Sequence, residues 1–209
     1  MTQQPIVHVA DSVLGYLGRS VLTVSNFRAF DGEMVAVLGE NGSGKSTLLL
    51  ALSGALKPIR GRIARDVSRH EVGYLPQSAE IGSLLPMTVA EYVSLGLTTG
   101  QRASASKLKS ALSAADIQDL ADAQASALSG GQRRRMMLAR ALVRSPRLLL
   151  IDEPEAGIDT KTRDFILVQL QELAQRGACV VMATHDQAWA GLAQRRYLLA
   201  DGVVRGEST

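Results

Sequence analysis

Hydrophobic positions divide the chain into strand-like and helix-like stretches. The run Met34–Leu38 is apolar at every position, which is typical of a strand buried on both faces of a parallel sheet. Shorter runs rich in apolar and β-branched residues predict further strands. These lie at 6–10, 20–27, 61–65, 72–75, 148–151 and 179–183. The predicted strands therefore gather in the first third and the last third of the chain.

Helical spacing follows the turn 39–44 and fills the middle of the chain. A helix is expected from Lys45 to about Leu56, where Lys57 and Pro58 end it. Segments rich in Ala, Ser and Leu predict the others. They lie at 88–95, 103–120 and 131–143, and apolar residues at 165, 166, 170 and 173 mark one face of a last helix. Because the strand signal fades from 78 to about 144, we expect a helical lobe inserted into an α/β core.

Composition narrows the class of protein. A chain of 209 residues has room for one α/β domain with a sizeable core. Hydrophobic residues make up 46% and charged residues 21%, as in soluble globular proteins. Lys and Arg number 23 against 20 Asp and Glu, a net charge of +3, and aromatic residues are only 4%. Neither a basic nucleic-acid surface nor a base-stacking platform is therefore expected.

The sequence carries no pattern for secretion or for crossing a membrane. Residues 1–5 do not open a basic segment followed by a long apolar stretch, so no signal peptide is expected. No apolar run approaches the roughly 20 residues that span a bilayer. The single cysteine, Cys179, lies in an apolar run and is expected to be a buried, unreactive thiol. A function at a membrane would need another chain to supply the membrane-spanning part.

The glycine-rich turn after the strand 34–38 matches the phosphate-binding loop pattern. Glycines let backbone N–H groups curl around phosphate oxygens, and the start of the following helix adds partial positive charge. In this pattern a lysine reaches the β- and γ-phosphates and a hydroxyl binds Mg²⁺. The alternative is a chance glycine-rich turn, which the preceding strand and the following helix disfavour. The candidate nucleotide-binding residues are Gly39, Glu40, Asn41, Gly42, Ser43, Gly44, Lys45, Ser46 and Thr47.

Two adjacent carboxylates follow the predicted strand 148–151. The carboxyl ends of parallel strands are where ligands bind in open α/β sheets. Asp152 can hold the hydration shell of Mg²⁺, and Glu153 can polarise a water in line with the γ-phosphate. A solvated acidic turn is the alternative, which the phosphate-binding loop disfavours. Glu153 is therefore the candidate general base.

A second anion site is predicted at 128–132, far from the first in sequence. Ser129 is a good helix N-cap, and Gly130 and Gly131 expose backbone amides at the start of a helix that continues through Gln132. The alternative is a capped helix and nothing more.

Arginines crowd the helix that follows this site. They lie at 133–135, 140, 144 and 147. We interpret them as a solvated helix face, with some side chains pairing with acids or phosphate, rather than as a nucleic-acid contact.

Together these segments resemble the ABC ATPases, the nucleotide-binding subunits of ABC transporters. The phosphate-binding loop, the Leu-Ser-Gly-Gly-Gln signature and the strand ending in Asp-Glu-Pro occur in that family's order and spacing, over nearly the whole chain. The resemblance implies an α/β fold: a RecA-like P-loop NTPase core with a mostly parallel sheet, an N-terminal antiparallel β subdomain and an inserted α-helical subdomain. Residues 1–77 and 146–209 of this single domain would form the core with the β subdomain. Residues 78–145 would form the helical subdomain that carries the signature.

The resemblance also assigns roles that the pattern alone leaves open. Gln77 corresponds to the glutamine that contacts Mg²⁺ or the attacking water, and His185 to the switch histidine that hydrogen-bonds the γ-phosphate. Ordinary surface positions are the alternatives for both. Tyr16 lies at about the distance of the family's adenine-stacking aromatic, against the alternative of a core tyrosine. Metal contacts would come from Ser46, Gln77 and Asp152.

A dimer interface is implied by the same resemblance. The phosphate-binding loop of one chain and the signature of the other would enclose each ATP in a head-to-tail dimer. Ser129 and Gly131 of the signature, with Gly157 and Asp159 of a segment that resembles the D-loop, would lie at this interface. Glu155 stands where many relatives have threonine, and the sequence offers no account of it.

The implied function is ATP hydrolysis that drives solute transport through a membrane protein. The implied cofactors are ATP and Mg²⁺. The implied partners are a second copy of the chain, an integral membrane subunit and, for an importer, a solute-binding protein, whereas nucleic acid is not an expected partner. The chain would be cytoplasmic and peripheral on the inner face of the cell membrane.

The transported substrate is less well defined by the sequence. Residues 72–77 and 85–93 look most like importers of zinc, manganese or iron chelates. Export of haem or another small solute, and a soluble role such as iron–sulfur cluster assembly, are the alternatives. The stretch between Gln77 and the signature has no heptads, unlike family members that act on chromosomes. A binding module without catalysis is disfavoured, because Lys45, Asp152, Glu153 and His185 are all present.

Overall fold

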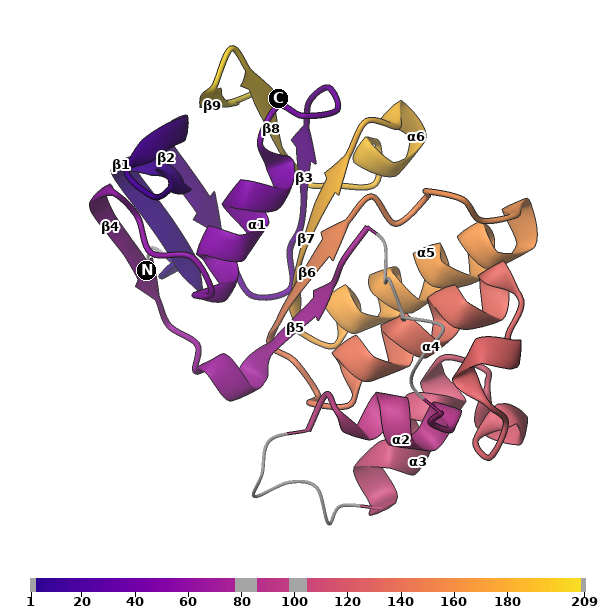
Figure 1. Cartoon of the computed structure of the whole chain (residues 1–209). Helices are drawn as coiled ribbons and strands as arrows, with labels where there is room; N and C mark the ends of the chain where they lie inside the picture. The colour runs from indigo at the N-terminus through magenta and orange to yellow at the C-terminus, as the bar shows by residue number, and fades with distance from the viewer. Residues whose placement is uncertain (1–2, 78–85, 98–104, 208–209) are drawn as a thin grey trace.

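The protein is built on one curved sheet with helices on both sides (Figure 1). The computed structural model describes residues 3–77, 86–97 and 105–207. The sheet has nine strands in the order β4-β1-β2-β9-β8-β3-β7-β6-β5. The strands are β1 (Val7–Tyr16), β2 (Arg19–Ala29), β3 (Met34–Leu38), β4 (Arg60–Arg65), β5 (Val72–Leu75), β6 (Leu148–Asp152), β7 (Cys179–Thr184), β8 (Arg195–Ala200) and β9 (Val203–Gly206). This arrangement, mostly parallel with antiparallel strands at one end, confirms the predicted α/β fold.

Parallel strands form the half of the sheet that carries the predicted chemistry. β3 pairs in parallel with β7 and β8, and β6 pairs in parallel with β5 and β7. β3, β6 and β7 are buried at every position, as their continuous apolar runs predict. On one face Val35 and Val37 pack in the core that contains α1 (Lys45–Ser53). On the other face Met34 packs in the core formed by the remaining long helices.

Antiparallel strands form the other end of the sheet. β1 pairs with both β2 and β4, and Leu17 and Gly18 make the tight turn between β1 and β2 with φ angles of 50° and 79°. Two successive positive φ angles match the right-handed twist of the strands that such a turn joins. The sheet curls around α1, which contacts β1 on one side and β6 and β7 on the other (Figure 1). The helix that follows the phosphate-binding loop is therefore enclosed by the sheet.

Helices occupy most of the described chain between β5 and β6. They are α2 (Val89–Ser94), α3 (Ala105–Ala114), α4 (Gly130–Leu142) and two short 3₁₀ turns, Gln118–Leu120 and Ala125–Ala127. α4 packs against α2 and α3, and also against β5 and α5 (Thr160–Gln175), so it joins the helical lobe to the sheet. A last short helix, α6 (Gln187–Ala190), packs on β3 and β7. Within the described ranges, no helix combines the length and the apolar character that crossing a bilayer requires.

Two predicted helices end earlier than expected. α1 stops at Ser53 rather than near Leu56, because Gly54 takes a left-handed conformation with a φ of 83° and caps the helix. The helix expected over 103–120 ends at Ala114, since the chain reverses through Asp116, whose φ is 52°. The first two residues of that expectation, 103 and 104, lie outside the described residues.

The sequence pattern does not predict β8 and β9. β8 begins with two half-buried arginines, which hide its alternation of buried and exposed positions, and β9 has only four residues. β8 nevertheless lies inside the sheet, between β3 and β9. Its Tyr197 ring packs on Phe27 of β2 at 4.4 Å, and the Tyr197 hydroxyl accepts a hydrogen bond from the Arg28 N–H at 2.8 Å. These contacts hold the strand where its own sequence signal is weak.

Gly73 allows β5 to lie close to α4. A Cβ atom at this position would lie 2.5 Å from the Ala141 carbonyl oxygen and 2.9 Å from Leu149 Cδ1. We therefore predict that Gly73→Ala forces β5 and α4 apart and lowers the free energy of unfolding by about 1–3 kcal/mol, as overpacked cores do. Urea denaturation measures the change. Gly206→Ala is the control, because its Cβ would make an ordinary contact with Tyr197 at 3.6 Å. Equal losses in the two variants would contradict the close approach.

Candidate functional site

The phosphate-binding pattern forms the turn between β3 and α1. Gly42 and Gly44 have φ angles of 80° and 108°, a region that glycine adopts without strain. A Cβ at Gly39 would lie 2.7 Å from the Leu199 carbonyl oxygen and 2.8 Å from Ser43 Oγ, so this position also requires glycine. The nine-residue helix α1 begins at Lys45, and no side chain of the described residues caps its first turn. Its N-terminal N–H groups are therefore available to an anion.

The Lys45 side chain is buried beside this turn. Its ammonium group donates hydrogen bonds to the carbonyl oxygens of Gly39 and Glu40, both at 2.9 Å, and lies 3.3 Å from Glu153 Oε1. Its side chain is only 4% exposed, so a buried positive charge meets a buried negative one. The loop thus presents its cation toward the end of β6.

Glu153 sits in a constrained turn at that strand end. Its φ of 43° is uncommon for a residue with a side chain, and its N–H donates to the Ala183 carbonyl oxygen at 2.8 Å. Gln77, just after β5, donates from Nε2 to Glu153 Oε2 at 2.5 Å. The two carboxylate oxygens of Glu153 therefore face Lys45 and Gln77, one each.

Asp152 is buried next to Glu153. Burial raises the pKa of its carboxyl group, and hydrogen bonding from the Ser46 side chain opposes that rise. Burial also raises the pKa of the Tyr74 hydroxyl, together with the charge of Asp152. The Ser46 hydroxyl and the Asp152 carboxylate, with the Gln77 amide nearby, are hard oxygen ligands of the kind that Mg²⁺ prefers. The donor set therefore fits Mg²⁺.

His185 follows β7 and is half-exposed. A hollow of about 440 Å³ is lined by His185 together with Gly39, Glu40 and Ser43. His185 and the phosphate-binding loop therefore line the same hollow. Its Nδ1 atom lies 3.5 Å from Glu155 Oε1. The structure thus gives Glu155, for which the sequence had no explanation, a direct contact with the candidate switch histidine.

Thr184 holds the Glu155 carboxylate in place. The Thr184 hydroxyl donates to Glu155 Oε1 at 2.5 Å and accepts from the Asp186 N–H at 3.0 Å. The carboxylate is almost fully buried, and its Oε2 atom has no hydrogen-bond partner among the described residues. Glu155 is therefore a buried carboxylate that Thr184 fixes beside His185, rather than an exposed acid.

Tyr16 lies at the end of β1 and is 44% exposed. The alternative of a core tyrosine is therefore wrong. Its hydroxyl lies 3.4 Å from Thr47 Oγ1, on the first turn of α1, so its ring is close to the phosphate-binding loop.

The signature residues form the start of α4. The Ser129 hydroxyl accepts from the Gln132 N–H at 3.3 Å, and Gln132 Oε1 accepts from the Ser129 N–H at 2.9 Å. Gly130 has open space where a side chain would lie, whereas a Cβ at Gly131 would lie 2.7 Å from Thr162 Oγ1 and 3.3 Å from Asp159 Oδ2. The signature therefore packs beside the start of α5.

The D-loop residues lie on the same side of the molecule. Asp159 caps α5 by accepting from the Thr162 N–H at 2.9 Å, which holds the pKa of the Asp159 carboxyl below its usual range. Gly157, with a φ of 67°, forms the turn before it. Figure 1 shows the starts of α4 and α5 well apart from the turn between β3 and α1. The two predicted anion sites are therefore separate places on one chain.

Arg134 is a site residue that sequence reasoning misses. Instead of lying on a solvated helix face, it is 4% exposed and reaches from α4 to the ends of β5 and β6. Burial lowers the pKa of its guanidinium, and the charges of Glu155, Asp152 and Glu153 oppose that change. Within a run of three arginines, no sequence signal separates it from its neighbours.

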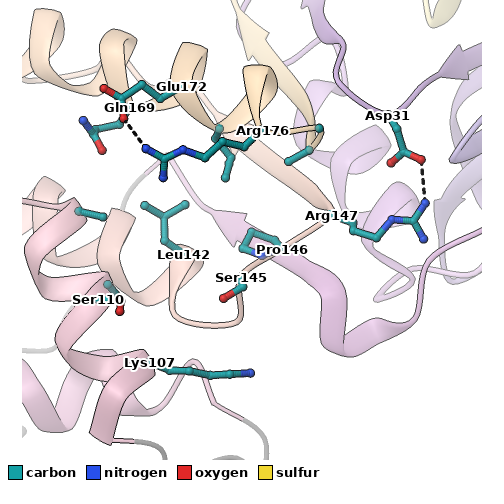
Figure 2. A pocket seen from close by; sticks show the side chains of 15 residues that line it. Asp31, Lys107, Ser110, Leu142, Ser145, Pro146, Arg147, Gln169, Glu172 and Arg176 are labelled. Carbon is teal, nitrogen blue, oxygen red and sulfur yellow. Dashed lines mark hydrogen bonds and ion pairs between the residues drawn. The ribbon is translucent and has the colours of Figure 1, made fainter.

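Figure 2 shows a second hollow, which has a volume of about 690 Å³. Residues from α3, α5 and the turn before β6 line it. Two of its arginines already have acidic partners: Arg147 pairs with Asp31 at 2.7 Å and Arg176 with Glu172 at 3.0 Å. None of the predicted nucleotide-binding residues lines it, so it is separate from the candidate site.

Comparison with known proteins identifies the family. A family model described as ABC transporter matches residues 22–156. The zinc import ATP-binding protein ZnuC of Roseobacter denitrificans is 38% identical over 205 residues, which cover 98% of this chain and 78% of that protein. The chain belongs to the ABC transporter family. The resemblance found in the motifs is thereby confirmed.

Solved structures of ABC proteins agree in fold. A putative metal-chelate type ABC transporter in an inward-facing conformation matches with a TM-score of 0.84 and 29% identity, over 98% of this chain and 84% of that one. A dimeric ATP-binding cassette bound to ADP and Pi matches with a TM-score of 0.81 and 28% identity, over 97% and 98%. As an ABC ATP-binding subunit, the chain binds and hydrolyses ATP.

We predict that Lys45→Ala abolishes most ATP binding. The substitution removes the cation that the loop presents to phosphate, and losing one partner of a buried charge pair costs about 2–5 kcal/mol, roughly 30-fold or more in affinity. Equilibrium binding of a fluorescent ATP analogue measures the loss. Lys57→Ala, which removes an exposed lysine beyond the end of α1, is the matched control and should bind normally. Unchanged affinity in Lys45→Ala would refute the assignment of the phosphate-binding loop.

Proposed function

We propose that this chain is the motor subunit of an importer of metal ions or metal chelates. The observation that carries ATP hydrolysis in this proposal is the placement of Glu153, with one carboxylate oxygen against Lys45 and the other against Gln77. A base, a phosphate-binding cation and a polar amide thereby converge at the ends of two adjacent strands. A cation for the phosphates and a group that activates the attacking water are parts that ATP hydrolysis uses.

Glu153 acts as the general base in this proposal. Phosphate oxygens of bound ATP take over the Lys45 ammonium, which frees one oxygen of Glu153 to accept a proton from the attacking water. Gln77 keeps the other oxygen oriented and offers its amide to the same water. His185, supported by Glu155, hydrogen-bonds the γ-phosphate from the side of β7, and Tyr16 stacks on the adenine.

Mg²⁺ would be held by Ser46 and Asp152, with Gln77 as a further oxygen donor. When bound, the ion neutralises charge on the β- and γ-phosphates.

The separation of the two anion sites supports a head-to-tail dimer. Because the start of α4 lies far from the phosphate-binding loop of its own chain, it is free to contact the nucleotide of a second copy. Ser129, Gly130, Gly131 and Gln132 bind that nucleotide, and Gly157 and Asp159 line the interface beside them. The dimeric cassette of similar fold supports this arrangement. Hydrolysis removes the γ-phosphate bridge, and the dimer opens.

Transport requires partners that span the membrane. We infer that residues 78–145 act as a helical subdomain and that 1–77 with 146–209 act as the catalytic core. The helical subdomain meets an integral membrane subunit on the cytoplasmic face of the cell membrane, and a solute-binding protein delivers the cargo. The similarity to a zinc import protein and to a metal-chelate transporter supports metal as that cargo. Of the sequence stretch that favours this reading, Leu85 lies outside the described residues.

Glu153→Gln tests the catalytic assignment. The amide keeps the shape of the side chain but cannot accept the proton of the attacking water, so hydrolysis should fall by about 10²–10⁴-fold, the usual contribution of a general base. ATP binding should persist, and the variant should accumulate as an ATP-bound dimer in size-exclusion chromatography. Steady-state phosphate release measures the rate. Turnover at the wild-type rate would remove Glu153 from the role of base.

Reconstitution tests the cargo and the direction of transport. The chain is purified together with a membrane subunit that co-purifies with it, and the complex is placed in vesicles that expose the ATPase outward. Each solute is supplied inside the vesicles together with the solute-binding protein. Import into the cell then corresponds to release of radioactive Zn²⁺ or Mn²⁺ to the outside when ATP is added. The same vesicles with Glu153→Gln should release none. Movement of haem from the outside inward, or no association with any membrane subunit, would contradict the proposal.

A further inference from the structure

Arg134 binds the main chain at the ends of two strands at once. Its Nη1 atom donates to the carbonyl oxygens of Pro76 and Gln77, both at 2.8 Å. Its Nη2 atom donates to the carbonyl oxygens of Asp152 and Glu153, at 3.2 and 2.8 Å. β5 and β6 are neighbours in the sheet, and these four carbonyls lie just past or at the end of their ladder. One guanidinium group therefore clamps both strand ends.

The clamp acts on the residues that the proposed mechanism uses. Glu153 has its N–H fixed to β7 through Ala183 and its carbonyl fixed to Arg134. Its positive φ is held by these two contacts, since an unusual backbone conformation persists only where surrounding structure fixes it. Gln77 is anchored by the same guanidinium through its carbonyl oxygen. Arg134 thus fixes the backbone that aims both side chains.

Burial makes this arginine costly to keep. A guanidinium inside a protein is stable only when its hydrogen bonds and charge are compensated. Carbonyl oxygens satisfy both terminal nitrogens, and the negative charges of Glu155, Asp152 and Glu153 favour the charged guanidinium. Its Nε atom has no partner among the described residues. A long apolar side chain could fill the same space, but it could not bind the four carbonyls.

The neighbouring arginines of α4 make different contacts. Arg135 pairs with Asp116 at 2.6 Å and lies over the Phe165 ring at 4.2 Å. Arg140, farther along α4, donates to the Tyr92 hydroxyl at 3.2 Å. Both bind helical elements or the turn after α3 rather than the sheet. Arg134 is the one of these three that reaches the catalytic strand ends.

We propose that Arg134 is a positioning residue that ties the signature helix α4 to Gln77 and Glu153 of its own chain. Arg134 lies one helical turn after Gly130, on the same rigid 13-residue helix. The inference rests on the proposed function: in the head-to-tail dimer, the start of α4 contacts the nucleotide bound to the partner. A shift of α4 at that nucleotide therefore moves the catalytic groups of the other site.

Linked dimers test this assignment, with two full chains joined by a long Gly/Ser linker. In the reference dimer one half is wild type and the other carries Glu153→Gln, so turnover comes from the wild-type half. In the same-half dimer Arg134→Gln is placed in the half that keeps Glu153. In the opposite-half dimer it is placed in the Glu153→Gln half, whose signature completes the active site. The two dimers thus separate an effect on a chain's own strand ends from an effect on the signature contact.

We expect kcat of the same-half dimer to fall by about 10- to 100-fold, the effect of a small misplacement of catalytic groups, with KM for ATP changed by less than about threefold. The opposite-half dimer should stay within about threefold of the reference. Equal losses in both dimers, a larger loss in the opposite-half dimer, or no loss in either would overturn the proposal.

Two further variants guard against misfolding. Arg140→Gln in the same half removes another arginine of α4 and should leave kcat within about twofold, since its hydrogen bond goes to Tyr92 of α2 and not to the strand ends that Arg134 binds. If Arg134→Gln fails to fold, Arg134→Lys replaces it, because an ammonium keeps the charge but cannot span four carbonyls. The same difference between the same-half and opposite-half dimers, smaller in size, is then expected, and its absence counts against the proposal.

A dimer with Glu153→Gln in both halves must be inactive. Activity there would refute the role of Glu153, independently of Arg134.

Discussion

The shared edge at which the parallel strands end is the constraint on which the nucleotide site depends. β3 leads into the phosphate-binding loop, β5 into Gln77, β6 into Asp152 and Glu153, and β7 into His185. Their register places these ends side by side, with Asp152 opposite Ala183 and Leu38 opposite Thr184. Groups far apart in sequence therefore meet at this edge of the sheet. Burial at this edge also removes water, so each charge must find a protein partner, as Lys45 and Glu153 do.

The sequence predicts this edge well because the strands that end there are continuous apolar runs. Strands buried on both faces give unbroken apolar stretches, and a glycine-rich turn or a pair of carboxylates marks where each one ends. The strands 34–38, 148–151 and 179–183 are accordingly found within a residue of their expected bounds.

What the sequence misses depends on tertiary contacts. β8 opens with Arg195 and Arg196, and only its pairing with β3 and the packing of Tyr197 make it a strand. Arg134 cannot be told from its neighbours, because the carbonyls that bury it come from segments nearly sixty and about twenty residues away. Glu155 is similar, since it lies in the turn after β6 and its partner Thr184 lies at the end of β7, 29 residues away in sequence.

Several arginines of this protein bind its own main chain at the ends of helices. Arg65 donates to the carbonyl oxygens of Ala51 and Leu52 in the last turn of α1, where helical carbonyls lack partners. Arg69 does the same for Gly54, and Arg144 for Gly96. These guanidinium groups bind the chain itself at helix ends and turns. Part of the arginine in the composition therefore serves contacts within the chain.

The strand order has a consequence for how the molecule is assembled during synthesis. β2 joins β3 only through β9 and β8, so the N-terminal hairpin and the parallel strands become one sheet when the last strands of the chain are in place. Pairings between distant segments form slowly, because a long loop must close before they are made. The incomplete protein emerging from a ribosome would expose the edges of β2 and β3 until β9 and β8 pair with them.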